Sequence, residues 1–341
     1  MLTFLSKIYS YFAVKRKKDF DSGKIPVVGL SIPVFSVGNI SAGGTGKTPF
    51  TIMLAKFLKD CGHRPAVVGR GYRRKSRGEV VVSDGKSILC DAETGGDEML
   101  LVAQAAKVPV IAHDKKYIGA LSAEKMFGID CLIIDDGFQH RYLARDIDIV
   151  LIDRNTLDNP HVWPKGRLRE PIEFIAEADI IVCPEELTGT RVHAPLLSVE
   201  KFVNNDILKI STKITAKDPY YLQTAKKISA DLPGEKVIAF SGLGQPDKFE
   251  KTLADTGFRL EKHFIFKDHY NYSKQDIIKI SKYASDRNIK IITTTEKDAV
   301  KIKKFGNVFD SMIRECIVCP IETEISEGRQ AFEKRILSAF D

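Results

Sequence analysis

The chain has 341 residues, of which 43% are hydrophobic and 28% are charged, and its formal net charge is +7. These values are ordinary for globular proteins and argue against a disordered chain, and the length favours about two domains. No apolar run reaches the roughly 18 residues that a membrane-spanning helix needs.

The first 24 residues carry four of the seven excess positive charges. Apolar side chains between Leu2 and Val14 recur at helical spacing, and a basic run from Lys15 to Lys18 follows them. A secretory signal has its positive charges before the apolar stretch, so this segment does not resemble one. Two interpretations stay open: a helix that packs on its own domain, or an interfacial helix with its apolar face in lipid and its lysines on anionic head groups. The rest of the chain is nearly balanced in charge and lacks the basic stripe of a nucleic-acid-binding protein.

Short apolar runs then alternate with helical patterns. This alternation predicts a mostly parallel α/β sheet. A helix is expected from about 49 to 60, and strands are expected at 32–37, 65–69, 79–83, 108–112, 131–135, 147–152 and 179–183.

The pattern becomes weak and polar between about 205 and 235, which indicates a domain boundary. A second α/β set follows, with strands expected at 236–240, 264–266, 290–294 and 315–319. We therefore expect an N-terminal amphipathic segment (1–25), a larger α/β lobe (26–225) and a smaller α/β lobe (226–341).

Six cysteines are present, and Cys316 and Cys319 form a CxxC pair. A zinc site would need a second pair or nearby histidines, and none is close in the sequence. The lone pair therefore does not by itself predict a metal or redox site.

The strongest local signal is the segment Ser41-Ala42-Gly43-Gly44-Thr45-Gly46-Lys47-Thr48, between an expected strand and an expected helix. It matches the phosphate-loop pattern GxxxxGK[ST], except that Ser41 stands at the first glycine position. The glycines let successive backbone N–H groups surround phosphate oxygens, while Lys47 would reach the β and γ phosphates and Thr48 would ligate Mg²⁺. The helix N-terminus also favours an anion. The segment predicts a P-loop NTPase-like fold.

The apolar strand expected at 131–135 ends in two carboxylates. A strand of this kind, about 90 residues after a phosphate loop, is typical of a Mg²⁺ site, and we assign that role to Asp135. Asp136 would contact the substrate or transfer a proton. No Asn-Lys-x-Asp guanine signature follows an apolar strand, which favours ATP over GTP. These parts alone do not separate an ATPase from a small-molecule kinase.

The next residues, Gly137-Phe138-Gln139-His140, then Leu143 and Arg145-Asp146, resemble the tetraacyldisaccharide 4'-kinase family of lipid A biosynthesis. Other motifs follow in the family's order: Val37-Gly38-Asn39-Ile40, Arg70-Gly71-Tyr72, Gly96-Asp97-Glu98, the segment 166–171 (GRLREP), Lys267-Asp268-His269 and the segment 295–301 (TEKDAVK). The resemblance covers nearly the whole chain, and this family usually has a non-glycine residue where Ser41 stands.

The resemblance implies transfer of the γ-phosphate of ATP to the 4'-hydroxyl of a tetraacyl disaccharide 1-phosphate, which gives lipid IVA. It implies a peripheral enzyme on the cytoplasmic face of the bacterial inner membrane. We expect ATP and Mg²⁺ as cofactors, the glycolipid and an anionic membrane surface as partners, and no obligate protein partner.

Activation of the sugar hydroxyl is assigned by the resemblance to Asp97 and His269, which lie 172 residues apart. A sugar hydroxyl has a very high pKa, and a carboxylate commonly takes its proton in a kinase. From sequence alone, Asp97 would also suit a helix cap and His269 a core or surface position. Asp136 stays open as the alternative base.

Substrate binding is expected of five residues near these motifs: Arg70, Gln139, His140, Arg169 and Glu170. The simpler alternative to substrate binding is a structural role, as a turn residue or as part of a solvated ion pair. The segment Glu296-Lys297-Asp298 receives no chemical role.

Two other functions compete with the kinase. One is a membrane-associated P-loop ATPase that switches a partner protein, and the other is a lipid-binding module with a relic nucleotide site. The intact set of Lys47, Thr48 and Asp135 argues against the relic site.

Overall fold

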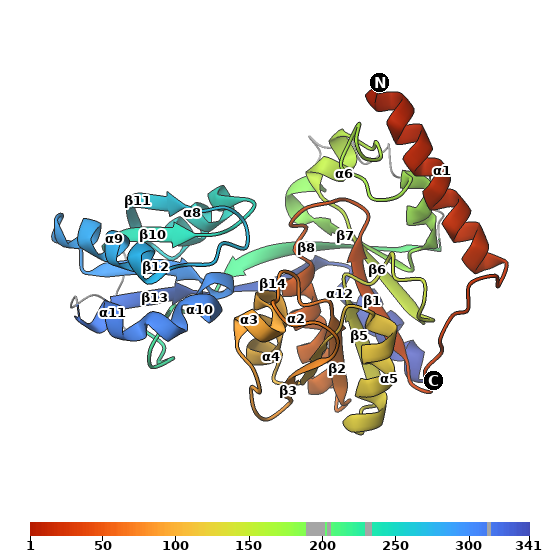
Figure 1. Cartoon of the computed structure of the whole chain (residues 1–341), viewed down its shortest axis with the longest axis horizontal. Coiled ribbons are helices and arrows are strands. Elements are labelled where there is room, and N and C mark those ends of the chain that lie inside the picture. Colours follow the sequence, from red (N-terminus) through yellow and green to blue (C-terminus); the bar gives the residue numbers. More distant parts are fainter. Residues whose placement is uncertain (189–201, 203–205, 229–233, 312–314) are drawn as a thin grey trace.

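A nine-stranded sheet forms the centre of the larger lobe, at the right of Figure 1. The computed structural model describes residues 1–188, 202, 206–228, 234–311 and 315–341. In spatial order the strands are β14 (Ile321–Glu327), β8 (Leu208–Ala216), β7 (Ile180–Pro184), β6 (Ile147–Leu151), β1 (Val34–Asn39), β5 (Cys131–Asp135), β2 (Pro65–Gly69), β4 (Pro109–Ala112) and β3 (Val80–Asp84). The two edge strands are antiparallel to their neighbours and the other pairs are parallel.

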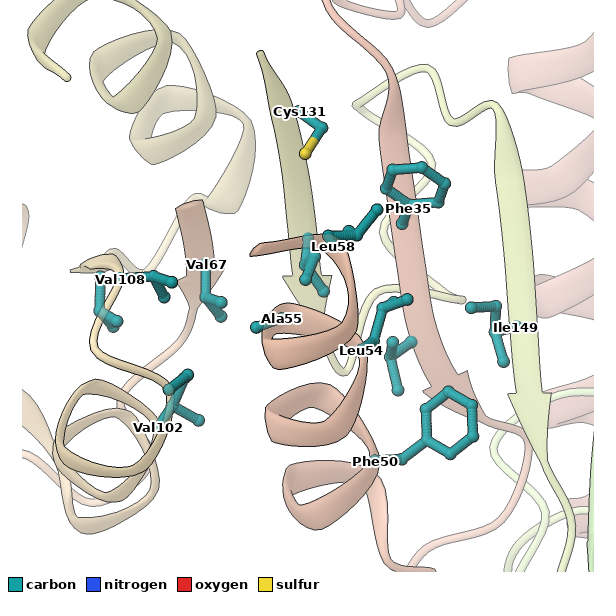
Figure 2. Close-up of a cluster of buried hydrophobic side chains, with 14 of the residues drawn as sticks. Phe35, Phe50, Leu54, Ala55, Leu58, Val67, Val102, Val108, Cys131 and Ile149 are labelled. Carbon is teal, nitrogen blue, oxygen red and sulfur yellow. The ribbon is translucent and has the colours of Figure 1, made fainter. Parts of the chain in front are cut away.

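Helices cover this sheet and bury its apolar strands. In Figure 2, Phe50, Leu54 and Leu58 of one helix point toward strand residues that include Phe35 and Ile149. These helix positions recur at i, i+4 and i+8, and all three side chains are fully buried. The helices of this lobe are α1 (Leu2–Asp21), α2 (Lys47–Asp60), α3 (Ala92–Gly95), α4 (Asp97–Ala106), α5 (Lys116–Met126), α6 (Arg154–Asp158) and α12 (Arg329–Leu337).

A five-stranded sheet forms the smaller lobe, at the left of Figure 1. Its strands, in spatial order, are β11 (Arg259–Ile265), β10 (Lys236–Ser241), β12 (Ile291–Thr295), β13 (Glu315–Cys319) and β9 (Tyr220–Tyr221). Its helices are α8 (Pro246–Asp255), α9 (Lys274–Ser285), α10 (Glu296–Ile302) and α11 (Gly306–Ser311). The predicted class, a P-loop-like α/β lobe with a second α/β lobe, is confirmed.

The C-terminal residues differ from the expected division of the chain. β14 pairs antiparallel with β8 at the edge of the larger sheet, and the ring centroids of Phe332 in α12 and Phe50 in α2 lie 6.0 Å apart. Residues from 321 onward therefore belong to the larger lobe, although they fall within the segment 226–341. β8 and β14 extend from that lobe toward the smaller one and carry the chain between them (Figure 1).

Cys316 and Cys319 are both buried in β13 and belong to the apolar core of the smaller lobe. Burial raises the pKa of the Cys319 thiol to about 12. Within the described part of the chain, no group of three or more His, Cys, Asp or Glu side chains could hold a metal ion. Both side chains contribute to the packing of that core.

Gly38, in β1, allows a close approach of the segment that follows β5. A Cβ on Gly38 would lie 2.5 Å from Phe138 Cβ and 2.7 Å from its backbone nitrogen. We expect Gly38→Ala to lower the free energy of unfolding by about 1–3 kcal/mol, as overpacking does. Urea denaturation measures this, with Gly29→Ala as the control because a Cβ there meets nothing within 4 Å. Equal stability of the two variants would contradict the close approach.

Candidate active site

The loop between β1 and α2 is shaped for an anion. Gly43 and Gly46 have φ values of 145° and 88°, which residues with a Cβ rarely adopt. A Cβ on Gly43, Gly44 or Gly46 would meet no atom within 4 Å, so this part of the loop borders open space. α2 begins at Lys47, which places its first N–H groups and the positive end of its dipole at the loop.

Ser41, at the first glycine position, is buried and helps to fix the loop. Its hydroxyl donates to Asp153 Oδ1 at 3.3 Å. The neighbouring backbone pairs with the GRLREP segment, because Ala42 N donates to Arg167 O at 2.7 Å and Arg169 N donates to the carbonyl before Ser41 at 2.8 Å. This segment therefore braces the phosphate loop, a function that its sequence did not indicate.

Lys47 is held at the centre of the site by two partners. Its Nζ donates to Asn39 Oδ1 at 3.1 Å and lies 3.4 Å from Asp136 Oδ1. Arg169 Nη1 donates to both carboxylate oxygens of Asp136 at 3.0 Å. Burial by itself would raise the pKa of this carboxyl, but the charges of Lys47, Lys116 and Arg169 hold it well below its usual range. Asp136 is therefore engaged by Lys47 and Arg169 in the ion network of the phosphate loop, and its alternative role as the base stays a prediction.

Lys116, which the sequence analysis missed, is a buried cation at the start of α5. Its Nζ donates to the backbone carbonyl of Asp136, and burial lowers its pKa. Its position shortly after the end of β4 was the available signal. Residues after the carboxyl ends of parallel strands meet at one edge of the sheet, which is where α/β proteins bind ligands.

Asp135, at the end of β5, is a buried carboxylate of the site. Thr51 Oγ1 donates to its Oδ1 at 3.0 Å, and Thr48 lies one helical turn before Thr51 on the same side of α2. Burial raises the pKa of Asp135 above its usual range, which indicates that its negative charge is incompletely compensated. Mg²⁺ that arrives on nucleotide phosphates needs only one or two protein ligands, so Asp135 and Thr48 fit such an ion.

The structure brings Asp97 and His269 together from different lobes. His269 Nδ1 lies 2.9 Å from Asp97 Oδ2 and 3.2 Å from Oδ1. Both side chains are about nine-tenths buried or more. Asp97 is the first residue of α4, and its Oδ1 also accepts the backbone N–H of Glu98 at 2.9 Å, so it contacts the start of the helix as well as His269. His269 lies in the turn after β11 with a φ of 56°.

Gln139 and His140 line the cavity and also make hydrogen bonds to backbone groups of the protein. Gln139 Nε2 donates to Asn39 O at 2.6 Å, and Arg169 Nη1 lies 3.4 Å from Gln139 Oε1. His140 Nε2 accepts the backbone N–H of Tyr117 at 3.1 Å. Both residues help to position the loop after β5, while their predicted contact with substrate stays a prediction.

The acceptor role of His140 makes folding stability depend on pH. Burial, helped by nearby cations, lowers the pKa of His140 to about 4 from 6.5. Between these values the unfolded chain binds the proton and the folded one does not, so stability falls as the pH falls. We expect this group to contribute a loss of about 2 kcal/mol between pH 7.5 and pH 5, and we expect His140→Gln to remove it in urea denaturation. Exposed His161→Gln is the control, and an unchanged pH slope in His140→Gln would contradict the assignment.

Glu170 belongs to a buried ionic cluster instead of a solvated surface pair. Its Oε2 lies 3.6 Å from Arg141 Nη2, and both side chains are about one-tenth exposed. Arg141 also pairs with Glu177, which lies 3.0 Å from Lys17 of α1. The cluster therefore connects the GRLREP segment to the N-terminal helix.

One cavity of about 980 Å³ joins these groups. Its lining includes Arg70, Lys47, Asp135, Asp136, Gln139, His140, Arg169, Glu170 and His269. Asp97 lies behind this lining, in contact with His269. On one side the lining comes from α1, through Tyr9, Phe12, Ala13 and Arg16. The volume suits a ligand that is larger than a nucleotide alone.

The N-terminal helix both packs on its lobe and exposes apolar side chains. Ser6 donates to the carbonyl of Val162, and the rings of Phe20 and Tyr142 meet edge to face at 5.0 Å. Toward its N-terminus the helix exposes Leu2, Phe4, Leu5, Ile8, Tyr9, Tyr11 and Phe12. Among the described residues, no helix combines the length and apolar character that crossing a bilayer requires.

Comparison with known proteins shows the family of the chain. The family model described as tetraacyldisaccharide-1-P 4'-kinase matches residues 1–341. The chain belongs to the tetraacyldisaccharide-1-P 4'-kinase family. Among similar proteins, the tetraacyldisaccharide 4'-kinase of Syntrophus aciditrophicus is 37% identical over 89% of this chain and 84% of its own. That of Desulfotalea psychrophila is 38% identical over 81% of this chain and 80% of its own.

A solved structure is similar over almost the whole kinase. The crystal structure of the "apo" form of LpxK from Aquifex aeolicus in complex with ATP has a TM-score of 0.80 and 30% identity, and covers 99% of this chain and 98% of that chain. The predicted family and kinase function are thereby confirmed, and neither the ATPase switch nor the lipid-binding module is supported.

Proposed function

We propose that this kinase transfers the γ-phosphoryl group of ATP to the 4'-hydroxyl of tetraacyldisaccharide 1-phosphate in the cleft between its lobes, with Asp97 and His269 activating the hydroxyl. The observation that carries this proposal is the 2.9 Å contact between His269 Nδ1 and Asp97 Oδ2 beside the phosphate loop's cavity. A carboxylate that is held by a histidine is a suitable acceptor for a hydroxyl proton.

The phosphate loop supplies the electrostatic part of the reaction. The N–H groups of residues 43–48 would bind phosphate oxygens, and Lys47 would exchange its bonds to Asn39 and Asp136 for the β and γ phosphates. Thr48 and Asp135 would hold Mg²⁺, which neutralises charge on the phosphates when bound. Arg169, which is held by Asp136, would bind an anionic group of either substrate.

Asp97 would accept the proton of the attacking hydroxyl. Burial by itself would raise its pKa, but the hydrogen bond from His269 and the charges of Lys297 and Lys301 lower it, so the carboxylate is ionised at neutral pH. His269 fixes the orientation of the carboxylate. The two lobes contribute one residue each, so the pair is complete only when the lobes are in contact.

The experiment that tests the proposal follows label from γ-labelled ATP into tetraacyldisaccharide 1-phosphate in detergent micelles. Wild type is expected to label the lipid, and Asp97→Asn and His269→Gln are expected to lose most of that label while they still bind ATP. Free phosphate without labelled lipid would instead support an ATPase. Full lipid labelling by Asp97→Asn would remove this residue from the chemistry.

We also propose that the exposed apolar side of α1 rests on an anionic membrane, peripherally on the cytoplasmic face. Support comes from its exposed Leu2 and Phe4 and from Lys15 and Lys18, the exposed lysines of the basic run. The double variant Leu2→Ser and Phe4→Ser is expected to bind anionic vesicles several-fold more weakly and to raise the KM for lipid more than the KM for ATP. Leu121→Ser on α5, also an exposed apolar position, is the control. Equal vesicle binding by wild type and the double variant would contradict the proposal.

A further inference from the structure

The TEKDAVK segment, to which the sequence assigned no chemical role, places two lysines beside the Asp97–His269 pair. The segment forms the end of β12 and the first turns of α10. Lys297 Nζ lies 3.1 Å from His269 Nε2 and 3.0 Å from Asp268 Oδ1. Lys301 Nζ lies 3.8 Å from Asp97 Oδ2.

Buried hydrogen bonds hold α10 against the turn that carries His269. Thr295 Oγ1 accepts the N–H of Asp298 at 3.1 Å and so caps the helix. Asp298, which is fully buried, accepts the backbone N–H of Gly242 at 2.9 Å. The carbonyl of Gly242 in turn accepts the N–H of His269 at 3.3 Å. Lys297 and His269 therefore belong to one braced unit.

The chemistry of the ammonium group determines which nitrogen of His269 carries the proton. An ammonium only donates hydrogen bonds, so His269 Nε2 is the acceptor in its contact with Lys297. A neutral imidazole that accepts at Nε2 has its proton on Nδ1, and Nδ1 is the atom that faces Asp97. The other tautomer would direct an N–H toward the ammonium and a lone pair toward the carboxylate, and both contacts would be repulsive.

We propose that Lys297 is a positioning residue of the kinase, which holds the His269 ring at Nε2 so that the Nδ1 proton is directed at Asp97. This inference rests on the proposed role of Asp97 and His269. Lys297 lies in contact with the histidine and acts through it. Its removal leaves the phosphate loop unchanged, so the rate of phosphoryl transfer changes and the affinity for ATP does not.

Lys297 also contributes to the charge around Asp97. Two carboxylates and the two lysines of α10 face the pair. Glu98 Oε1, on α4, lies 3.8 Å from His269 Nε2, and Asp268 Oδ2, in the same turn as His269, lies 3.9 Å from that nitrogen. The ring of Tyr72 lies edge-on, 4.9 Å from that of His269. Lys297 and Lys301 both lower the pKa of Asp97. Loss of the Lys297 charge therefore raises this pKa, and activity that needs the ionised carboxylate begins at a higher pH.

Three substitutions separate the hydrogen bond from the charge. Lys297→Met removes both, Lys297→Gln keeps a donor without charge, and Lys297→Arg keeps both. The control is Lys304→Met, because Lys304 makes an ion pair with Glu93 across the lobes at 2.8 Å without contacting the pair. Each full-length variant is assayed for kcat, the KM for ATP and lipid, and the pH profile of kcat, after its unfolding temperature is checked.

We expect Lys297→Met to lower kcat roughly 10- to 100-fold, as loss of an orienting partner does in metal sites, with the KM for ATP within about twofold of wild type. The kcat of Lys297→Met is expected to rise with pH at a higher pH than the kcat of wild type does. Lys297→Gln should show the same shift of the pH profile as Lys297→Met but a smaller loss of kcat. In Lys297→Arg and Lys304→Met, both kcat and its pH profile should remain near wild type. Side-chain ¹⁵N shifts, assigned with His269→Gln, should show the Nδ1–H tautomer of His269 in wild type and a mixture in Lys297→Met.

Wild-type kcat and pH profile in Lys297→Met, or an Nε2–H tautomer of His269 in wild type, would overturn the inference. Equal kcat losses in Lys297→Met and Lys304→Met would also overturn it, because adhesion of the lobes would then be the cause. The proposed function is tested separately by Asp97→Asn. If that variant stays active, the proposed function fails, and if it is inactive while Lys297→Met is normal, only this inference fails.

Discussion

Asp97→Asn is expected to lower kcat by about 10²- to 10⁴-fold, which is the usual contribution of a positioned general base. Asparagine keeps the size of the side chain and can still contact His269, but it cannot take the proton of the 4'-hydroxyl. ATP binding should be unaffected, because the phosphate loop lies on a different strand–helix connection. Single-turnover transfer from γ-labelled ATP measures the chemical step, and equilibrium binding measures ATP affinity.

The matched control is Asp91→Asn, six residues earlier in the same lobe. Asp91 caps α3 by accepting the N–H of Thr94 at 2.9 Å, a bond that asparagine can replace. This variant should keep wild-type kcat. A loss in Asp97→Asn of less than about threefold, or an equal loss in both variants, would be incompatible with a base at Asp97.

Lys47→Met should cause the second large loss, about 10²- to 10³-fold in kcat, as removal of one preorganised electrostatic donor does. Lys47 is already held at the site by Asn39 and Asp136, so little reorganisation is needed when phosphate arrives. Affinity for ATP should fall as well, because the lysine is expected to contact phosphates in the ground state and in the transition state.

Lys56→Met is the control, because Lys56 lies on the same helix and pairs with Glu322 at 3.4 Å in a half-exposed contact. Such pairs contribute at most about 1 kcal/mol to stability, and kcat should be unchanged. Steady-state kinetics and ATP binding of both variants provide the comparison. If Lys47→Met keeps more than a tenth of wild-type kcat, the phosphate loop does not act as described.

The nucleotide half of the site could be predicted because its signals are local. The glycines, Lys47 and Thr48 lie within eight residues of each other, and the apolar run before Asp135 indicates a strand end. In a parallel sheet, side chains after successive strand ends converge at one edge. Arg70 and Lys116 follow β2 and β4 at that edge, so Lys116 was predictable by the same rule.

Other features of the fold and of the site depend on contacts between distant segments, which sequence spacing does not predict. β8 and β14 do alternate apolar or threonine side chains with polar ones, as strands do. Their pairing, however, joins segments more than a hundred residues apart, and sequence spacing does not show it. The contact between Asp97 and His269 was expected only from the family resemblance. Lys297 has a polar sequence environment and acquires its role from the turn at His269, which reaches it from another strand of the smaller sheet.

The most direct test of the account is a double-mutant cycle of Asp97→Asn and His269→Gln, with single-turnover transfer from γ-labelled ATP to tetraacyldisaccharide 1-phosphate as the measured rate. Two residues that act as one unit give non-additive losses. The account predicts that the double variant is no slower than Asp97→Asn alone within about threefold. Losses that multiply, with the double variant slower by the product of the two single losses, would contradict a joint role of the pair.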